Sequence, residues 1–356
     1  MMAQSLNNPL RLAAKRDGKR VRWSVESQWL EVSGLRIHAR IAGEGPPVVL
    51  VHGYGVSSSY MLPLAQSLAP SFSVFAPDLP GFGRSQRPRR PAGIAELAAA
   101  LAGWLDTAGL QRPAFVANSM GCQIVTELAV RFPGRVGPMV LIGPTVDPQR
   151  RAARHQLLAG LRDAGREPGS LLALAARDDA VAGVGALVAT ARSALADRIE
   201  ERLPLIAQPT LVVRGEHDGF VGQRWAETAS ALLPRGSLVI VPREPHAVHY
   251  TRPDLIARIA LELLGEEGEQ AGSQLPRRLP HRHVSASKAH EPGAGQDSLP
   301  LRGDPRREEP VVIAPHEQRP GLNRRELQAQ VSVGCEHRSA KETEGPGPHR
   351  VADERR

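Results

Sequence analysis

Cysteine is almost absent from this chain of 356 residues. The two cysteines, Cys122 and Cys335, exclude a disulfide framework and a zinc site built on cysteine ligands. No apolar run approaches the roughly 20 residues that a helix needs to cross a bilayer, so we expect no membrane span. The N-terminal residues also lack the long apolar segment of a secretory signal. These features lead us to expect a cytoplasmic protein.

Aromatic side chains are missing from the last part of the chain. The last one is Tyr250, and residues 266–356 hold none, while their acidic and basic residues are equal in number. A segment of this composition buries too little apolar surface to offset its chain entropy. We expect residues 266–356 to form a disordered tail, with local structure only in EEPVVIAP and RRELQAQVSV. The tail is either an interaction segment or an unselected extension, and residues 28–265 are expected to form one globular domain.

Positive charge is concentrated before the tail, because the net charge is +8 and the tail is neutral. Residues 1–27 contribute part of this excess, with six basic residues against Asp17 and Glu26. Such an arm can bind nucleic acid, but no zinc-finger spacing or aromatic RNA-binding signature accompanies it. We therefore expect residues 1–27 to be a flexible, solvated arm without a nucleic-acid partner.

Strand-like and helix-like stretches alternate along the expected domain. Several of the strands are continuous Val, Leu and Ile runs, which is typical of strands covered on both faces. The first two strands are expected to form a hairpin around Ser33 and Gly34. The order predicts an α/β fold with a mostly parallel eight-stranded sheet flanked by helices. The expected strands are residues 28–32, 35–41, 46–53, 73–80, 114–120, 138–144, 210–218 and 237–244.

One interval interrupts the alternation. Residues 146 to about 206 are rich in Ala, Leu and Arg and contain no convincing strand, which predicts three or four short helices. We expect a small helical cap at about residues 147–203, lying over the active site rather than serving as padding. Some cap leucines should pack on the domain and others should line an apolar pocket; the candidates are Leu157, Leu158, Leu161, Leu171, Leu172 and Leu174.

Two short motifs carry the signature of acyl-transfer chemistry. The first is Ala117-Asn118-Ser119-Met120-Gly121, between an apolar strand and a helical stretch, where a tight turn exposes a serine. The usual pattern has glycine in place of Ala117, so this pentapeptide alone is weak evidence. The second motif is His52-Gly53-Tyr54-Gly55 after the strand PPVVL. The backbone amides of Tyr54 and Met120 are our candidates for the two donors that stabilise an oxyanion.

A base and an acid complete the candidate relay. Serine is a poor nucleophile at neutral pH and needs an adjacent base, which in turn needs an anion to orient it. Asp218 and His246 each follow an apolar strand, and the carboxyl ends of parallel strands meet at one edge of a sheet. The order Ser119, Asp218, His246 is the one found in α/β hydrolases. Asp147, after the preceding strand, is the alternative acid.

The chain resembles the α/β-hydrolase family over about residues 28–265. The matching stretches are HGYG, DLPGFGRS, NSMG, GEHDGFV and PHAVHYTRPD. Relatives typically carry proline seven residues after the catalytic histidine, and Pro253 stands in that place after His246. The resemblance implies that Ser119 is the nucleophile, His246 the general base and Asp218 its orienting anion.

Other residues near these motifs have weaker assignments. We expect the substrate pocket to include His52, Gly53, Phe82 and His249, with His52 mainly supporting the oxyanion turn. His249 is either a pocket or a surface group, and Cys122 is expected to be a small core residue. No third ligand accompanies His246 and His249, so we expect no metal. The sequence contains no phosphate loop or dinucleotide motif, and we expect no cofactor.

These residues predict a cofactor-independent serine hydrolase that cleaves a carboxylic ester or related acyl substrate through an acyl-enzyme. A carbon–carbon bond hydrolase of ring-cleavage products is one alternative, although the Trp expected after its histidine is absent. An acyltransferase or perhydrolase is another. A non-catalytic ligand-binding module on the same fold is the fourth possibility, and the intact triad argues against it. The expected partner is a small acyl substrate, and the sequence does not fix the oligomeric state.

Overall fold

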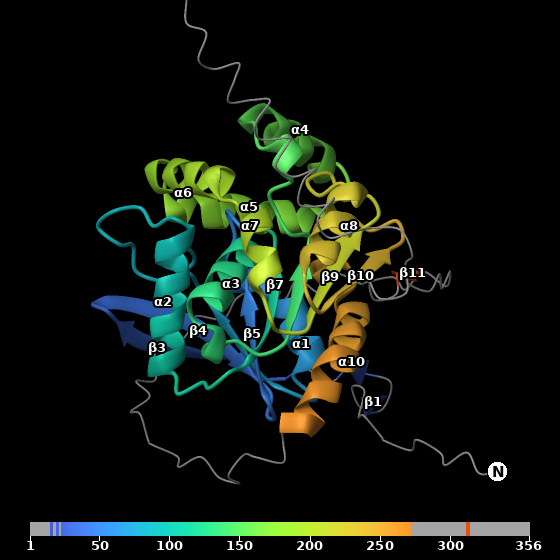
Figure 1. Cartoon of the computed structure of the whole chain (residues 1–356). Coiled ribbons are helices and arrows are strands. Elements are labelled where there is room, and N and C mark those ends of the chain that lie inside the picture. The colour runs from blue at the N-terminus through green and yellow to red at the C-terminus, as the bar shows by residue number, and fades with distance from the viewer. Residues whose placement is uncertain (1–14, 17–18, 21–22, 272–310, 314–356) are drawn as a thin grey trace, which may run out of the picture.

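The computed structural model describes residues 15–16, 19–20, 23–271 and 311–313 (Figure 1). Its centre is a sheet with the order β11-β10-β9-β8-β7-β5-β6-β4-β3. Eight of these strands belong to the continuous described segment, which confirms the predicted fold class. They are β3 (Glu26–Val32), β4 (Leu35–Ala42), β5 (Pro47–Val51), β6 (Ser73–Pro77), β7 (Ala114–Asn118), β8 (Met139–Ile142), β9 (Thr210–Gly215) and β10 (Gly236–Val241).

The sheet is antiparallel at one side and parallel through its middle. β3 and β4 form the predicted hairpin, whose turn residues Ser33 and Gly34 have φ values of 49° and 77°. β4 also pairs antiparallel with β6. The pairs from β6 through β5, β7, β8 and β9 to β10 are all parallel. The carboxyl ends of these central strands therefore share one edge, which is where an α/β sheet builds its site.

The continuous apolar runs are explained by burial on both faces of the sheet. In β5, Val49 and Val51 belong to one hydrophobic cluster, and Val48 and Leu50 to the other. Helices α2 (Ile94–Thr107), α3 (Met120–Arg131) and α8 (Gln223–Leu232) contribute to the first cluster. Helices α1 (Leu62–Leu68), α9 (Val248–Thr251) and α10 (Pro253–Ala271) contribute to the second. A strand covered in this way has no polar face, so its sequence does not alternate.

Four helices lie between β8 and β9, in the interval where a cap is expected. They are α4 (Ala153–Ala164), α5 (Gly169–Ala182), α6 (Val184–Ala196) and α7 (Ile199–Arg202). Figure 1 shows α4, α5 and α6 together at the top of the molecule. Short 3-10 turns complete the described elements: η1 (Ser58–Met61), η2 (Pro133–Arg135), η3 (Pro148–Arg150) and η4 (Leu203–Leu205).

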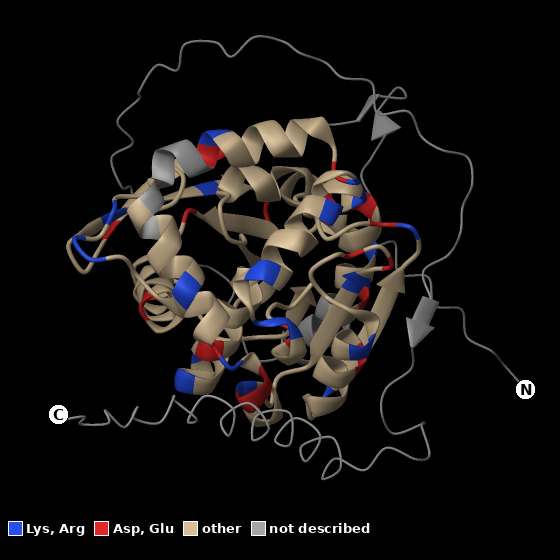
Figure 2. Cartoon of the chain, turned by 90° about the horizontal axis from the view of Figure 1, so that it is seen from above, with Lys and Arg blue, Asp and Glu red and all other residues tan. Residues whose placement is uncertain are grey.

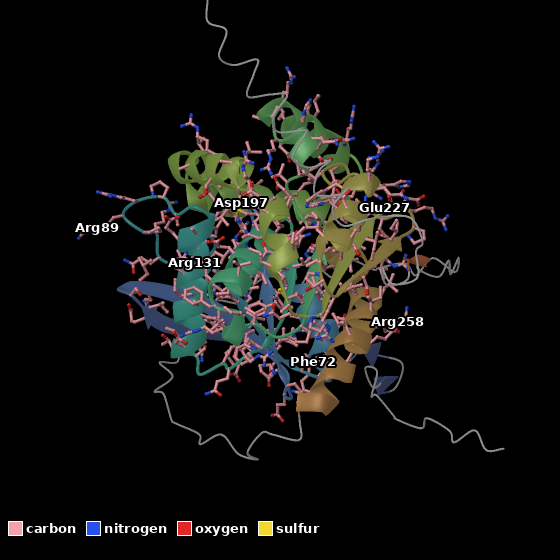
Figure 3. The ribbon with its side chains drawn as sticks, viewed as in Figure 1. Phe72, Arg89, Arg131, Asp197, Glu227 and Arg258 are labelled. Carbon is pink, nitrogen blue, oxygen red and sulfur yellow. The ribbon has the colours of Figure 1, made fainter. Side chains whose placement is uncertain are left out.

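Hydrogen bonds fasten the last part of this insertion to α3. The side-chain amide of Gln123, which is completely buried, donates to the backbone oxygen of Ala194 at 2.8 Å and to Asp197 at 2.9 Å. Asp197 also accepts from Arg202 at 2.6 Å. Figure 3 labels Asp197 between the cap helices and the region of α3. The end of the cap is therefore held in a defined place over the domain.

Charged residues are distributed around the described part of the molecule. Figure 2 shows basic and acidic positions interspersed on the outer helices and loops. Two short strands of the N-terminal arm, β1 (Lys15–Arg16) and β2 (Lys19–Arg20), pair with each other antiparallel. Within the described residues, no helix combines the length and apolar character that a bilayer crossing requires.

The described residues include only part of the expected N-terminal arm and C-terminal tail. α10 continues to Ala271, six residues beyond the expected limit at residue 265. β11 (Val311–Ile313), from the stretch EEPVVIAP, pairs antiparallel with β10. The predicted disorder is therefore wrong for residues 266–271, which are helical. The rest of the tail apart from β11, and most of the 1–27 arm, lie outside the described residues, so the proposed division of the chain stays a prediction.

Candidate active site

Ser119 stands at a sharp turn between β7 and α3. Its backbone has φ 55° and ψ −122°, a strained combination for a residue with a side chain. Its N–H donates to the backbone oxygen of Ile142 at 2.9 Å, which fixes the turn against β8. A Cβ on Gly121 would lie 2.5 Å from the backbone oxygen of Val51, so only glycine fits there. Ser119 is partly exposed between buried neighbours, as a nucleophile elbow requires.

Ala117 departs from the usual elbow pattern without straining the turn. It is the fourth residue of β7, is completely buried, and pairs with Val51 and Leu141 on the neighbouring strands. Because its backbone is part of the regular strand, it does not need the positive φ that favours glycine. The replacement of glycine by alanine is therefore compatible with the elbow.

The turn after β5 lies against this elbow. A Cβ on Gly53 would stand only 3.1 Å from the Cβ of Ser119. The ring of His52 fixes the turn, because Nε2 accepts from the Leu79 amide at 3.0 Å and Nδ1 donates to the Gly53 oxygen at 2.8 Å. Burial lowers the pKa of His52 and keeps the ring neutral, as these two bonds require. Phe82 packs edge-on against the same ring at 5.5 Å between centroids.

Asp218 and His246 form a buried pair on the next strands of the same edge. Oδ2 of Asp218 lies 2.8 Å from Nδ1 of His246, and Oδ1 accepts from the amides of Phe220 and Val221 at 2.8 Å each. With Nδ1 held by Asp218, the ring presents Nε2 as the free nitrogen. Nε2 is buried and has no hydrogen-bond partner.

A short chain of contacts joins the serine turn to this pair. Ser119 is bonded to Ile142, and a Cβ on the following residue, Gly143, would lie 2.7 Å from Cε1 of His246. The carboxyl ends of β7, β8, β9 and β10 thus bring Ser119, Gly143, Asp218 and His246 to one edge in strand order.

The charge around His246 favours its protonated form. Burial alone lowers the pKa of this histidine, but the attraction and hydrogen bond of Asp218, together with Asp163 and Glu167, raise it to about 9. His246 must therefore lose a proton before it can act as a base.

The chain is similar to known proteins in sequence and in structure. A family model described as "alpha/beta hydrolase fold" matches residues 46–169. The 2-hydroxymuconate semialdehyde hydrolase of Pseudomonas sp. strain CF600 is 29% identical over 263 residues, which cover 66% of this chain and 84% of the relative. The membrane phospholipase A described as a bacterial virulence factor has a solved structure with a TM-score of 0.59 and 25% identity, over 68% of this chain and 86% of that one.

The chain has the α/β-hydrolase fold.

Other similarities to this α/β-hydrolase are shorter or show the fold alone. The 2-hydroxy-6-oxo-6-phenylhexa-2,4-dienoate hydrolase of Burkholderia cepacia is 33% identical over 119 residues, or 32% of this chain and 41% of the relative. At 35% identity, the chain matches about a third (34%) of the length of proteins from Mycobacterium. The structure of E-2-(acetamidomethylene)succinate hydrolase has a TM-score of 0.61 at 22% identity, over 68% of this chain and 100% of that one.

Asp147, the alternative acid, occupies a different environment in this α/β-hydrolase. It caps η3 by accepting from the Gln149 amide at 2.9 Å, and Arg150 lies 3.7 Å away. The carboxylate that contacts the ring of His246 is that of Asp218. The structure therefore favours Asp218 over Asp147 as the orienting anion.

Two cap carboxylates, which the sequence analysis did not identify, hold the loop of His246. Asp163 in α4 is buried and accepts from the amides of Gly219 at 3.2 Å and His246 at 3.3 Å. Glu167, just after α4, accepts from the Ala247 amide at 2.8 Å. Burial and the adjacent Asp163 raise the pKa of Glu167. Their spacing of four residues was the only signal, and it is common on exposed helices.

His249 is completely buried, which excludes the surface position that we considered for it. Its ring lies edge-on to Tyr60 at 4.5 Å, and neither ring nitrogen has a hydrogen-bond partner. Burial and the nearby His246 lower the pKa of His249 to about 3, so the ring is neutral at ordinary pH. Burial and the acidic groups of Glu167, Asp163 and Asp218 raise the pKa of Tyr60. Both residues line the interior near His246 as neutral groups.

A second Ser–His–Asp arrangement lies elsewhere in the domain. Nδ1 of His38 is 2.8 Å from Asp78, and Nε2 is 3.1 Å from the hydroxyl of Ser27. Ser27 is an exposed residue, the second of β3, and does not stand at a turn. Asp78 also accepts from the backbone amides of Ser58 and Arg84. The DLPGFGRS motif therefore has a structural role, because its Asp78 binds three separate segments of the chain through hydrogen bonds.

The remaining predicted residues have varied positions. Met120 begins α3 and is buried, so its amide lies at a helix N-terminus, whereas Tyr54 is 41% exposed. Cys122 is buried as expected, and burial raises the pKa of its thiol, which keeps it unreactive. No group of three His, Cys, Asp or Glu residues suited to a metal ion occurs among the described residues.

The expectation that cap leucines line the pocket is wrong for four of them. Because α4 and α5 turn these side chains to solvent, they are exposed in this structure: Leu157 by 66%, Leu158 by 50%, Leu161 by 65% and Leu172 by 43%. Leu171 is buried in the hydrophobic cluster to which α1, α9 and α10 contribute, and Leu174 is partly buried against that cluster. The inward face of α4 carries Ala159 and Asp163 instead.

Proposed function

We propose that this α/β-hydrolase cleaves a carboxylic ester or related acyl substrate through an acyl-enzyme on Ser119. The observation that carries the proposal is the pairing of His246 with Asp218 beside a strained serine turn. Asp218 occupies Nδ1 of the ring, and the buried Nε2 is left without a partner. A base oriented in this way is what a serine hydroxyl needs to become a nucleophile.

The proposed reaction has two halves. In the first, Nε2 of His246 takes the proton of Ser119 while Oγ bonds to the ester carbonyl carbon. The backbone amides of Tyr54 and Met120 are proposed to donate to the resulting oxyanion. His246 then gives its proton to the departing alcohol oxygen, and the acyl group stays on Ser119.

In the second half, water replaces the alcohol. His246 removes a proton from the water, the hydroxide oxygen bonds to the acyl carbon, and Ser119 leaves with the proton returned by His246. The products are the carboxylic acid and the free serine. Every proton passes through His246, so the reaction as proposed needs neither a metal nor a cofactor.

Several relatives support hydrolysis of an acyl substrate. The solved structure that matches at 25% identity is that of a membrane phospholipase A. An esterase from Thermogutta terrifontis has the same fold with a TM-score of 0.59 at 21% identity. These similarities support the reaction class and leave the substrate to experiment.

Carbon–carbon bond hydrolysis is the second candidate, because a relative with that kind of substrate aligns over most of its length. The 2-hydroxymuconate semialdehyde hydrolase matches over 84% of its own chain. Both reactions use a serine, an aspartate and a histidine at this edge of the sheet, so the arrangement of Ser119 and His246 does not separate them.

The test compares the two substrate classes on the same variants. Hydrolysis of p-nitrophenyl esters of increasing acyl length is measured beside the loss of absorbance of a ring-cleavage dienoate. We expect ester turnover by the wild-type protein and by Ser27→Ala, which removes the serine of the second arrangement. If kcat/KM for the dienoate is higher than for every ester, ester hydrolysis is contradicted and carbon–carbon bond hydrolysis is the function.

A further inference from the structure

Helix α5 has one face turned toward the domain and one turned to solvent. Leu171 and Asp178 are 7% and 5% exposed, and Leu174 and Ala175 between them are partly buried. These positions are three, four and seven residues apart, which places them on one side of a helix. The residues between them on the other side are exposed. Asp178 therefore continues an otherwise apolar, inward-facing stripe.

The carboxylate of Asp178 is buried without a matching group. Its Oδ2 is inaccessible to solvent and has no hydrogen-bond partner. Asp163 and Glu167 each accept a hydrogen bond from a backbone amide through one oxygen, although Oε2 of Glu167 is also buried without a partner. Burying a carboxylate without a hydrogen-bond partner costs free energy. A hydrogen-bond donor bound next to Asp178 would offset this cost.

The surroundings of Asp178 connect it to the proposed active site. Its electrostatic attraction acts on His52, the ring that fixes the oxyanion turn. Leu171, about two turns earlier in α5, belongs to the same hydrophobic cluster as Tyr60 and Val248. The inward face of α5 also packs against η1, the turn that carries Tyr60.

The side chain of Arg87 lies beside the residue that follows α5. The guanidinium of Arg87 lies against Gly183, where a Cβ would be 3.0 Å from a guanidinium nitrogen. Among the described residues, no hydrogen bond joins Arg87 to Oδ2 of Asp178. Oδ2 of Asp178 therefore keeps its capacity to accept a hydrogen bond from a group that enters the interior beside it.

We propose that Asp178 is the polar end of the substrate pocket and receives a hydrogen-bond donor of the substrate, an ammonium or hydroxyl group. This inference rests on the proposed function, because it names the substrate class of that same site. A carboxylate accepts hydrogen bonds and repels another carboxylate. Substrates with an amino or hydroxy group are favoured over those with an acidic one, and anionic dienoates are disfavoured.

The test uses four p-nitrophenyl esters with acyl chains of similar length. They are the esters of heptanoic, 6-hydroxyhexanoic, 6-aminohexanoic and adipic acid, the last as its anionic monoester. We expect kcat/KM to be highest for the amino or hydroxy ester and lowest for the monoadipate. In Asp178→Asn the advantage of the amino ester over heptanoate should fall by roughly tenfold, since a charged hydrogen bond is lost.

Two control variants separate recognition from other roles. Glu201→Gln removes one negative charge from a side chain that is 61% exposed on α7, and it should leave the preference unchanged. Arg87→Gln should also leave it unchanged. A loss of the amino preference in Arg87→Gln equal to that in Asp178→Asn would overturn the proposal, because Asp178 would then act through Arg87. An equal loss for all four esters in Asp178→Asn would overturn it as well.

A binding measurement keeps the inference distinct from the proposed function. Calorimetry with hexylamine, 1-hexanol and hexanoate needs no turnover of any ester. Tighter binding of hexylamine or hexanol than of hexanoate, weakened in Asp178→Asn, would support the polar pocket even if no ester were cleaved. Ester cleavage with no such preference would contradict the inference and leave the proposed function standing. If Asp178→Asn does not fold, the order of binding to the wild-type protein decides.

Discussion

Gly143 lies so close to the ring of His246 that a Cβ on it would stand 2.7 Å from Cε1 and 2.8 Å from Nδ1. Gly143→Ala should therefore displace the ring from Asp218 and lower kcat by at least about a hundredfold, because small displacements of a catalytic group are costly. Activity on p-nitrophenyl esters and the thermal midpoint measure the two effects.

Gly109→Ala is the matched control for this variant. Gly109 has φ 70°, close to the 55° of Gly143, but nothing lies within 4 Å of its would-be Cβ. Both variants should lose about 1 kcal/mol of stability from the positive φ. Equal activity in the two variants would show that contact with His246 is unimportant.

The pH dependence of the reaction should reflect the acidic groups around His246. Since the pKa of His246 is raised to about 9 by Asp218, Asp163 and Glu167 against the effect of burial, kcat/KM should rise with pH above neutrality as the ring loses its proton. Asp163→Asn keeps an acceptor for the backbone amides but removes a charge. It should move the midpoint of this rise to lower pH.

Glu167→Gln is the comparison for the pH profile. Burial and Asp163 raise the pKa of Glu167, so the neutral form of this carboxyl is already favoured. Glutamine is also neutral, and the substitution therefore changes the charge near His246 less. Its midpoint should move less than that of Asp163→Asn. His249 is neutral over this range because its pKa is about 3, so it adds no step. An unchanged midpoint in Asp163→Asn would contradict this account of the charge around His246.

Asp78 should contribute to stability in acid. Burial raises the pKa of this carboxyl, but the hydrogen bonds of His38, Arg84 and Ser58 and the attraction of His52 outweigh it and lower the pKa from 3.8 to about 2. Between these values the unfolded state binds more protons than the folded state, so stability falls as pH decreases from about 4 to about 2. The contribution above that range is ~2 kcal/mol.

Denaturation of the wild-type protein and Asp78→Asn at several pH values measures this contribution. The difference in unfolding free energy should be largest above pH 4 and should shrink in more acidic solution. A difference that stays constant down to pH 2 would mean that the titration of Asp78 does not account for its stabilising role.

The two kinds of cap leucine should respond differently to truncation. Leu171→Ala removes a buried side chain of the α5 stripe and should lower stability by about 2–4 kcal/mol and alter the preference for acyl length. Leu157→Ala truncates a side chain that is 66% exposed and should change neither. A shifted acyl preference in Leu157→Ala would mean that the cap reaches another arrangement during catalysis.

The sheet and its edge were predictable because their sequence signals are strong and local. The Val, Leu and Ile runs identify strands buried on both faces, and the glycines at positions 53 and 121 permit close approaches that the structure contains. Ser119, Asp218 and His246 each follow such a strand, so their common edge follows from a parallel sheet.

The inward face of the cap was not predictable in the same way. In α4 and α5 several leucines are exposed while Asp163 and Asp178 are buried. This reverses the usual relation between polarity and burial, on which sequence patterns depend. The reversal has a physical basis for Asp163, whose carboxylate satisfies two backbone amides from loops far away in the sequence. Such partners are known only once the chain is folded.

The central claim is that Ser119 is the nucleophile, and covalent labelling tests it most directly. The protein is treated with a fluorophosphonate, digested, and the modified peptide is identified by mass spectrometry, with Ser119→Ala and Ser27→Ala as the paired variants. We predict one adduct, on Ser119, with labelling and ester hydrolysis retained in Ser27→Ala and abolished in Ser119→Ala. An adduct on Ser27, or ester hydrolysis by Ser119→Ala above about a tenth of the wild-type rate, would contradict the account, because loss of a catalytic serine costs several orders of magnitude.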